Sequence, residues 1–124
     1  MELPKLLGLR SIIYPVDDLE KSKTWWVNAL GFEPYFDQPF YVGFKVGGYE
    51  LGLFPDGSKE DGPITYWGVA DIEAAFSSFV ENGAVVVTEI DEVGDGIKVA
   101  VLRSAESELF GLIYNPHFTQ EPAL

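Results

Sequence analysis

Two stretches of the chain carry apolar residues at helical spacing, and each begins at an aspartate and ends at a glycine. Asp18 and Asp71 can each accept a backbone N–H at a helix start, and Gly31 and Gly83 can end the helices. In the first stretch one side is formed by Leu19, Trp26, Ala29 and Leu30. In the second, a stripe that we expect to be buried is formed by Ile72, Ala75, Phe76, Phe79 and Val80. The pattern predicts two amphipathic helices.

Short strand-like runs follow each helix in sets of three, separated by glycine, proline and polar residues. The runs after the first helix are 34–38, 41–47 and 49–55, and those after the second are 84–90, 97–103 and 109–114. Each half therefore has the order strand, helix, strand, strand, strand. A polar, glycine-rich bridge spans 56–62. We predict one domain over 1–124, built of repeat halves 8–56 and 62–116.

The predicted fold class is α+β, with two tandem βαβββ modules whose curved mixed sheets surround a cavity. One helix covers only one face of its four strands. The other face must be closed by the partner half, by a second subunit or by a ligand, and such concave sites bind small molecules. A dry core filled with aromatic side chains is the alternative.

Charge narrows the classes of partner. Lys and Arg number 8 against 20 Asp and Glu, so the net charge is −12. Nucleic acid would be repelled because the chain lacks a basic stripe, and anionic membrane surfaces are disfavoured for the same reason. The absence of cysteine excludes disulfides and thiolate chemistry, and the single histidine excludes any site that needs two. The start, Met1-Glu2-Leu3-Pro4-Lys5, has no signal pattern, so we expect a cytoplasmic protein.

Both halves contain motifs that resemble those of the vicinal oxygen chelate superfamily, the grouping of glyoxalases, bleomycin-resistance proteins, fosfomycin-modifying enzymes and extradiol dioxygenases. In the first half they are Val16-x-Asp18-Leu19-Glu20-x-Ser22, Trp25-Trp26 and Leu30-Gly31-Phe32. In the second half they are Val69-x-Asp71-Ile72-Glu73-Ala74, Gly83-Ala84, Val99-Ala100-Val101-Leu102-Arg103 and Leu109-Phe110-Gly111-Leu112-Ile113. The resemblance implies a paired βαβββ fold with a ligand cavity, and we expect a homodimer.

The resemblance also implies where a divalent metal ion would be held, by His or Glu on the first and last strands of each half. The first-strand positions are Ser11 and Ile64 in this chain, and the last-strand positions are Gly52 and Gly111, with Glu50 as the alternative in a shifted register. Hydroxyl, alkyl and hydrogen groups are poor metal donors. We therefore predict that the family's metal site is absent and that no cofactor is bound.

Side-chain alternation along strands suggests which residues face the cavity. Ile13 shares the side of Ser11, and Tyr66 shares that of Ile64, whereas Tyr14 and Trp67 point to the helices. Glycines in central strand positions often mark the close approach of a ligand. The candidate ligand-binding residues are Ser11, Ile13, Glu50, Gly52, Phe54, Ile64, Tyr66 and Gly111.

The preferred functional hypothesis is metal-independent binding of a small organic molecule, such as a cationic aromatic drug or metabolite, which the acidic chain would attract. One alternative is a glyoxalase- or dioxygenase-type lyase or isomerase that uses Glu50, or a metal not recognised from the sequence. A second is a non-catalytic dimeric interaction module. His117 follows the last strand, and we interpret it as a packing or solvent-facing residue rather than as a general base.

Overall fold

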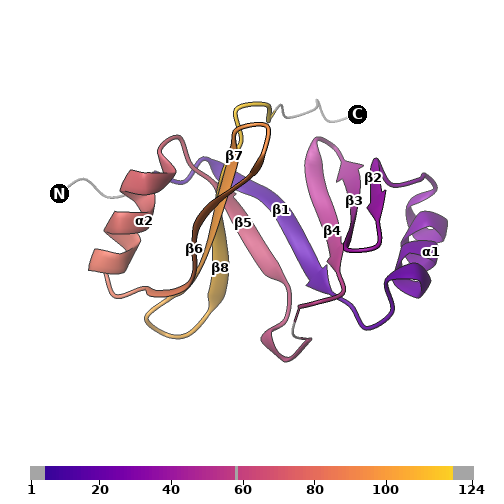
Figure 1. Ribbon diagram of the computed structural model, residues 1–124, viewed down its shortest axis with the longest axis horizontal. Helices are drawn as coiled ribbons and strands as arrows, with labels where there is room; N and C mark the ends of the chain where they lie inside the picture. Colours follow the sequence, from indigo (N-terminus) through magenta and orange to yellow (C-terminus); the bar gives the residue numbers. More distant parts are fainter. Residues whose placement is uncertain (1–4, 58, 119–124) are drawn as a thin grey trace. The chain divides into compact units, whose positions relative to one another are not determined.

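The computed structural model describes residues 5–57 and 59–118. The first four residues, on which the expected location depends, lie outside this part. Within it the chain forms eight strands, two α-helices and one short 3₁₀ helix (Figure 1). Their bounds are β1 Gly8–Pro15, α1 Leu19–Leu30, β2 Phe36–Gln38, β3 Tyr41–Val46, β4 Tyr49–Phe54, η1 Lys59–Asp61, β5 Ile64–Gly68, α2 Ile72–Glu81, β6 Val85–Gly94, β7 Ile97–Arg103 and β8 Leu109–Tyr114. The predicted α+β class and order of elements are confirmed.

The chain divides into two compact units, which we call the first module (residues 11–64) and the second module (residues 5–10 and 65–118). The division falls inside β1 and at the start of β5 rather than in the polar bridge 56–62. Each module has one helix and four strands, as the repeated pattern predicts. That the two modules form one domain around a shared cavity stays a prediction.

The strand order is the same in both modules. In the first module it is β2-β3-β4-β1, and in the second it is β6-β7-β8-β5. The first and last strands of each module pair in parallel, β1 with β4 and β5 with β8, and the other neighbours are antiparallel. Between the two strands of each parallel pair the chain forms a helix and two further strands, and the helix packs on its own module's sheet.

The helix ends follow from local chemistry. Asp18 and Asp71 each accept the backbone N–H of the residue three positions on, both at 3.0 Å, which satisfies one free donor at each helix start. After the last turn, Gly31 and Gly83 adopt φ angles of 86° and 99°, a left-handed conformation that glycine reaches without steric cost. Both predicted starts and both predicted stops are confirmed.

Each helix packs on its own hydrophobic core. The first core is formed by Val16, Leu19, Val42, Phe44 and Leu53, with Tyr14 and Trp26 packed against it. The second is formed by Val69, Ile72, Ala75, Ala100, Leu102 and Leu112, with Phe76 and Phe79 packed against it. One position of the stripe that we expected to be buried is wrong, because Val80 is exposed. On the first helix, Ala29 is exposed although it shares the apolar side. Periodicity alone does not separate buried from solvent-facing positions at the flank of a helix.

Candidate functional site

The face of the first module that points away from α1 brings several of the predicted ligand-facing residues together. Cross-strand register places Ser11 opposite Glu50 and Ile13 opposite Gly52, so all four side-chain positions share one face. Phe54 lies two residues beyond Gly52 on β4 and has the same orientation. The opposite positions of β3 and β4 belong to the core under α1. We call this surface the helix-free face of the first module.

Two tyrosines converge on the carboxylate of Glu50. The hydroxyl of Tyr35 donates a hydrogen bond to Oε1, and the hydroxyl of Tyr41 donates one to Oε2. We call these three residues the Glu50 cluster. Burial, followed by the hydrogen bond to Glu50, raises the pKa of Tyr35 well above its usual value, so its hydroxyl keeps its proton at neutral pH.

A pair of glycines makes room for these tyrosine rings. Gly43 and Gly52 lie directly opposite each other on β3 and β4. A Cβ at Gly52 would overlap the outer end of the Tyr41 ring, and one at Gly43 would lie 3.1 Å from Cε1 of Tyr35. The rings therefore lie flat on a backbone floor, and any larger side chain there would move them away from Glu50.

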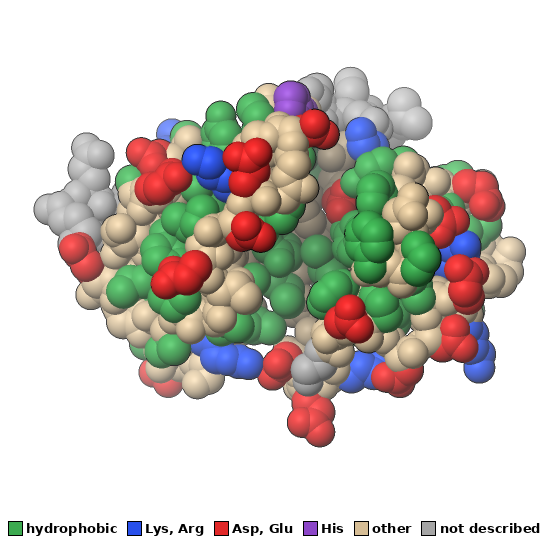
Figure 2. Space-filling view, viewed as in Figure 1, with side chains coloured by type: hydrophobic (Ala, Val, Ile, Leu, Met, Phe, Trp, Pro, Cys, Tyr) green, Lys and Arg blue, Asp and Glu red, His purple; other side chains and the backbone are tan. Residues whose placement is uncertain are grey.

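An exposed aromatic rim adjoins the Glu50 cluster. Phe36 lies with its ring centroid 6.5 Å from that of Tyr35, 6.0 Å from that of Tyr41 and 6.0 Å from that of Phe40. Tyr35 and Phe40 are 53% and 60% exposed, which is unusual for side chains of this size. In Figure 2, hydrophobic side chains gather over β2, β3 and β4 with acidic groups around them. The carboxylate of Glu50 thus lies beside several partly exposed aromatic rings.

One cation borders the site. Lys45 lies opposite Glu50 across the β3–β4 pair, and its Nζ is 5.3 Å from the ring centroid of Tyr35. The ring of Tyr35 can thus accept an ammonium group on its face. Lys45 is exposed, so its side chain can leave this position.

In the second module, an aromatic ring fills the corresponding glycine position. Tyr66 and Gly111 are register partners on β5 and β8, and a Cβ at Gly111 would lie 2.9 Å from Cγ of Tyr66. Burial raises the pKa of Tyr66. Ile64, two residues earlier on β5, shares its orientation. A molecule on this face would meet the ring of Tyr66 rather than the backbone of Gly111.

A second glycine of this module is covered by a cation. The guanidinium of Arg10 lies against Gly68, and its Cζ is 3.9 Å from the ring centroid of Phe118. His117 uses Nε2 to donate a hydrogen bond of 2.9 Å to the carbonyl oxygen of Asp95, in the hairpin between β6 and β7. His117 is exposed, and its interpretation as a packing or solvent-facing residue agrees with this contact.

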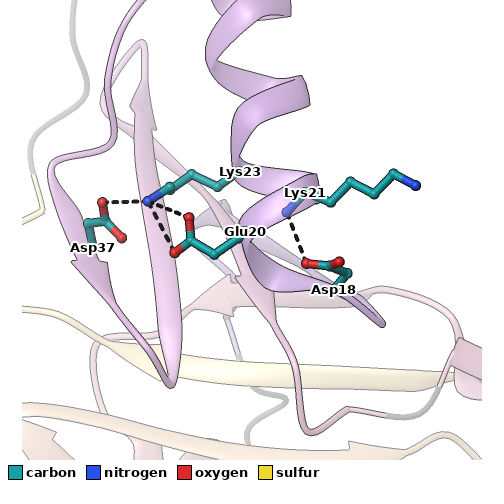
Figure 3. Close-up of polar contacts among 5 residues, drawn as sticks. All are labelled: Asp18, Glu20, Lys21, Lys23 and Asp37. Atoms are coloured by element: carbon teal, nitrogen blue, oxygen red, sulfur yellow. Dashed lines mark hydrogen bonds and ion pairs between the residues drawn. The ribbon is translucent and has the colours of Figure 1, made fainter.

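A shallow groove at the start of α1 is lined by polar residues that pair with one another (Figure 3). Lys23 on α1 lies 3.0 Å from Oδ2 of Asp37 on β2 and 3.1 Å from Oε2 of Glu20. Hydrogen bonds to Asp37 and then Glu20 raise the pKa of Lys23. Asp18, on the same rim, is the helix cap. These contacts fasten the helix to an edge strand and leave no unpaired buried group for a ligand.

The donor groups do not fit a transition-metal site. Among residues 5–57 and 59–118, no three His, Asp or Glu side chains come together in a way that could hold an ion. At the positions implied by the resemblance, the rings of Tyr41 and Tyr66 cover Gly52 and Gly111. Glu50, the one carboxylate nearby, accepts hydrogen bonds from two neutral phenols. Zinc, iron and manganese need several imidazole or carboxylate ligands.

Residues 8–110 match the family model described as "Glyoxalase/Bleomycin resistance protein/Dioxygenase superfamily". The chain belongs to this superfamily. The predicted resemblance is therefore confirmed over nearly all of the described chain. A search among curated proteins found no match.

Solved structures of superfamily members share this fold. A methylmalonyl-CoA epimerase in complex with methylmalonyl-CoA and NH4+ has a TM-score of 0.75 at 16% identity, covering 95% of this chain and 100% of the epimerase. A Mn(II)-bound glyoxalase from Novosphingobium aromaticivorans has a TM-score of 0.75 at 17% identity, covering 98% and 43%. A superfamily member from Vibrio splendidus has a TM-score of 0.65 at 24% identity, covering 86% and 99%. At these identities the likeness shows the fold.

Sequence reasoning singled out Glu50 but missed its two tyrosine partners as site residues. A signal for part of the arrangement was present in Gly47-Gly48, which adopt φ angles of 60° and 88° and form a two-residue hairpin turn. Such a turn fixes the β3–β4 register, and with it the Gly43–Gly52 pair. Within the described residues, none of the helices is long and apolar enough to cross a membrane.

Proposed function

We propose that this superfamily member binds a small organic molecule on the helix-free face of the first module, without a resident metal ion. The observation that carries the proposal is the convergence of Tyr35 and Tyr41 on Glu50 beside an exposed aromatic rim. The carboxylate of Glu50 offers its oxygens to a ligand, and the adjacent rings offer stacking surfaces.

A cationic aromatic compound suits this site best. The chain carries a net charge of −12, which attracts cations over distances of about a Debye length, ~8 Å at physiological salt. Close contact with Glu50 supplies the charge pairing, and stacking on Tyr35, Phe36 or Phe40 adds cation–π and dispersion energy, about 1 kcal/mol for each exposed ring. Binding of this kind would sequester the compound without changing it.

The enzymatic alternative assigns Glu50 as a proton acceptor. Each of its oxygens accepts one tyrosine hydroxyl and keeps a second lone pair, which could receive either an N–H group of a cation or a transferred proton. The exposed aromatic rim and the net charge of −12 suit a cationic ligand, and on that ground we favour binding over catalysis. A homodimer and a cytoplasmic location stay predictions, and sedimentation at high concentration tests the first of them.

Calorimetric titration of chelator-treated protein tests the proposal. The probes are 2-phenylethylamine and benzamidine, with 2-phenylethanol and benzamide as neutral controls of similar shape. We expect the two cations to bind the wild-type protein, and we expect Glu50→Gln to reduce their affinity at least tenfold. The matched control is Glu73→Gln, which makes the same change on α2 of the second module, where Glu73 pairs with Lys98 at 3.1 Å. Binding that appears only after a divalent metal is added, or that Glu50→Gln leaves unchanged, would overturn the proposal.

A further inference from the structure

The hydrogen atoms of the Glu50 cluster are already allocated. A tyrosine hydroxyl has one hydrogen, and an ionised carboxylate has none. Tyr35 gives its hydrogen to Oε1 of Glu50, and Tyr41 gives its hydrogen to Oε2. The polar atoms that these three side chains still offer to another molecule are therefore oxygen lone pairs.

From this allocation, and resting on the proposed function, we propose that the Glu50 cluster selects an organic cation that carries N–H groups. Primary and secondary ammonium, amidinium and guanidinium groups bring donors only, which is what a set of acceptors requires. A carboxylate, phosphate or carbonyl compound brings only hydrogen-bond acceptors. Its oxygens would meet the lone pairs of the cluster, and no hydrogen bond could form. A quaternary ammonium has the charge but no N–H, so it would gain only the charge and the stacking.

The environment of the Tyr35 hydroxyl supports this allocation. Although the side chain is 53% exposed, partial burial and then the bond to Glu50 raise the pKa of the hydroxyl, so the proton stays on the phenol throughout the physiological range. The two rings lie against Gly43 and Gly52, where the absence of a Cβ leaves the space in which both hydroxyls reach Glu50. The glycine pair of the sheet thus permits the arrangement in which both hydroxyl hydrogens are directed to the carboxylate.

Lys45 shows that an ammonium group fits beside the cluster. Its Nζ lies 5.3 Å from the ring centroid of Tyr35, on the same face as Glu50. Lys45 is then a competitor for a bound cation, and its removal should strengthen binding. Ser11, opposite Glu50 on the other side, has a hydroxyl that both donates and accepts, so it does not change the preference.

The exposed rim defines the remainder of the ligand. Phe36 and Phe40 form an edge-on pair with centroids 6.0 Å apart and an interplanar angle of 66°, next to Tyr35 and Tyr41. An aromatic group attached to the cation can stack here while the nitrogen reaches Glu50. The inferred class is an arylalkylamine or arylamidine.

A methylation series tests the inference. The probes are 2-phenylethylamine, its N,N,N-trimethyl derivative and 3-phenylpropionate, titrated by calorimetry into chelator-treated protein. We expect the amine to bind at least tenfold more tightly than the quaternary compound, and the carboxylate to show no binding at millimolar concentration. Lys45→Met should increase the affinity for 2-phenylethylamine several-fold. Tyr35→Phe should reduce the preference for the amine, and the matched control Tyr14→Phe, on the core side of β1, should leave it unchanged.

The outcomes separate this inference from the proposed function. Equal affinities for the amine and the quaternary compound would overturn the requirement for N–H groups while leaving metal-independent binding in place. Tighter binding of 3-phenylpropionate would overturn the acceptor allocation. If neither 2-phenylethylamine nor benzamidine binds, or if Glu50→Gln leaves the binding of both unchanged, the proposed function fails and the inference with it.

Discussion

The two modules share one scaffold and differ in the chemistry that they place on it. In each, a glycine on the last strand lies under a tyrosine ring: Gly52 under Tyr41, and Gly111 under Tyr66. Tyr41 covers its glycine with the outer end of the ring and carries its hydroxyl to Glu50. Tyr66 covers its glycine with the inner part of the ring. The two rings come from different strands, Tyr41 from β3 and Tyr66 from β5, so each module covers its glycine in a different way.

The charged groups differ in the same way. The first module presents the carboxylate of Glu50 to two hydroxyl donors, whereas the second places the guanidinium of Arg10 against Gly68 and Phe118. A cation would be attracted to the first arrangement and repelled by the second. The two modules therefore have the same strand order, and the side chains on and beside those strands determine which charge each module presents.

Loss of a matched core leucine should have the largest effect on stability. Leu53 and Leu112 directly follow Gly52 and Gly111, and both are fully buried. Leu53→Ala and Leu112→Ala should each reduce the free energy of unfolding by about 2–5 kcal/mol, because each leaves a cavity in its own core. Denaturant unfolding followed by circular dichroism measures this. A loss below about 1 kcal/mol in either variant would show that the two cores are not equivalent.

Adding one methyl group at each of the matched glycines should affect the stability of the two modules differently. At Gly111 a Cβ would meet the inner ring atoms of Tyr66, which cannot move without displacing the side chain, so Gly111→Ala should cost about 1–3 kcal/mol. At Gly52 it would meet the outer end of Tyr41, which can swing aside. Gly52→Ala should therefore change stability by less than about 1 kcal/mol.

The same two variants should have the reverse order in ligand binding. Gly52→Ala should displace Tyr41 from Glu50 and so reduce the affinity for 2-phenylethylamine. Gly111→Ala should leave this affinity unchanged. Unfolding and titration of the same preparations provide both measurements. If Gly52→Ala is the more destabilising variant and still binds the amine normally, the account of Tyr41 as the ring that can move and that serves the site is wrong.

The ionisation of Tyr35 should give the smallest effect, confined to alkaline pH. Its pKa is raised in the folded state, chiefly by burial and then by Glu50, above the value of roughly 10 in the unfolded chain. The resulting stability is fully present below pH ~10 and is lost as the pH rises toward the folded pKa. Glu50→Gln should lower this pKa, but not to the unfolded value, because burial remains.

Phenolate absorbance, compared with that of a Tyr35→Phe variant, isolates the titration of this one tyrosine. A pKa of Tyr35 near that of a free tyrosine in the wild-type protein would contradict the buried, hydrogen-bonded arrangement. An unchanged pKa in Glu50→Gln would contradict the hydrogen bond alone.

Local patterns were sufficient for most of the fold. The caps Asp18 and Asp71 and the turn Gly47-Gly48 act within a few residues of their own position, so helix starts and strand breaks could be predicted. Val80 shows the limit of periodicity, because it continues the apolar spacing of α2 and is nevertheless exposed.

The site was predictable only in part, because its contacts are not local. Alternation identified the side of Glu50 and Gly52, and that is confirmed by the register. The hydrogen bond between Tyr35 and Glu50 depends on the register of β2, β3 and β4. It also depends on Gly43 and Gly52, which have no side chain that would displace the tyrosine rings. The glycines were interpreted as marks of ligand approach, whereas the groups that approach Gly52 and Gly111 most closely are tyrosine rings.

Backbone amide NMR of chelator-treated protein titrated with 2-phenylethylamine tests the central claim most directly, because both modules report at once. The account predicts shifts at residues 35–52, around Tyr35, Tyr41 and Glu50, with no comparable change at Tyr66, Gly68 or Gly111. Shifts centred on the second module, or shifts that require an added divalent metal, would contradict it.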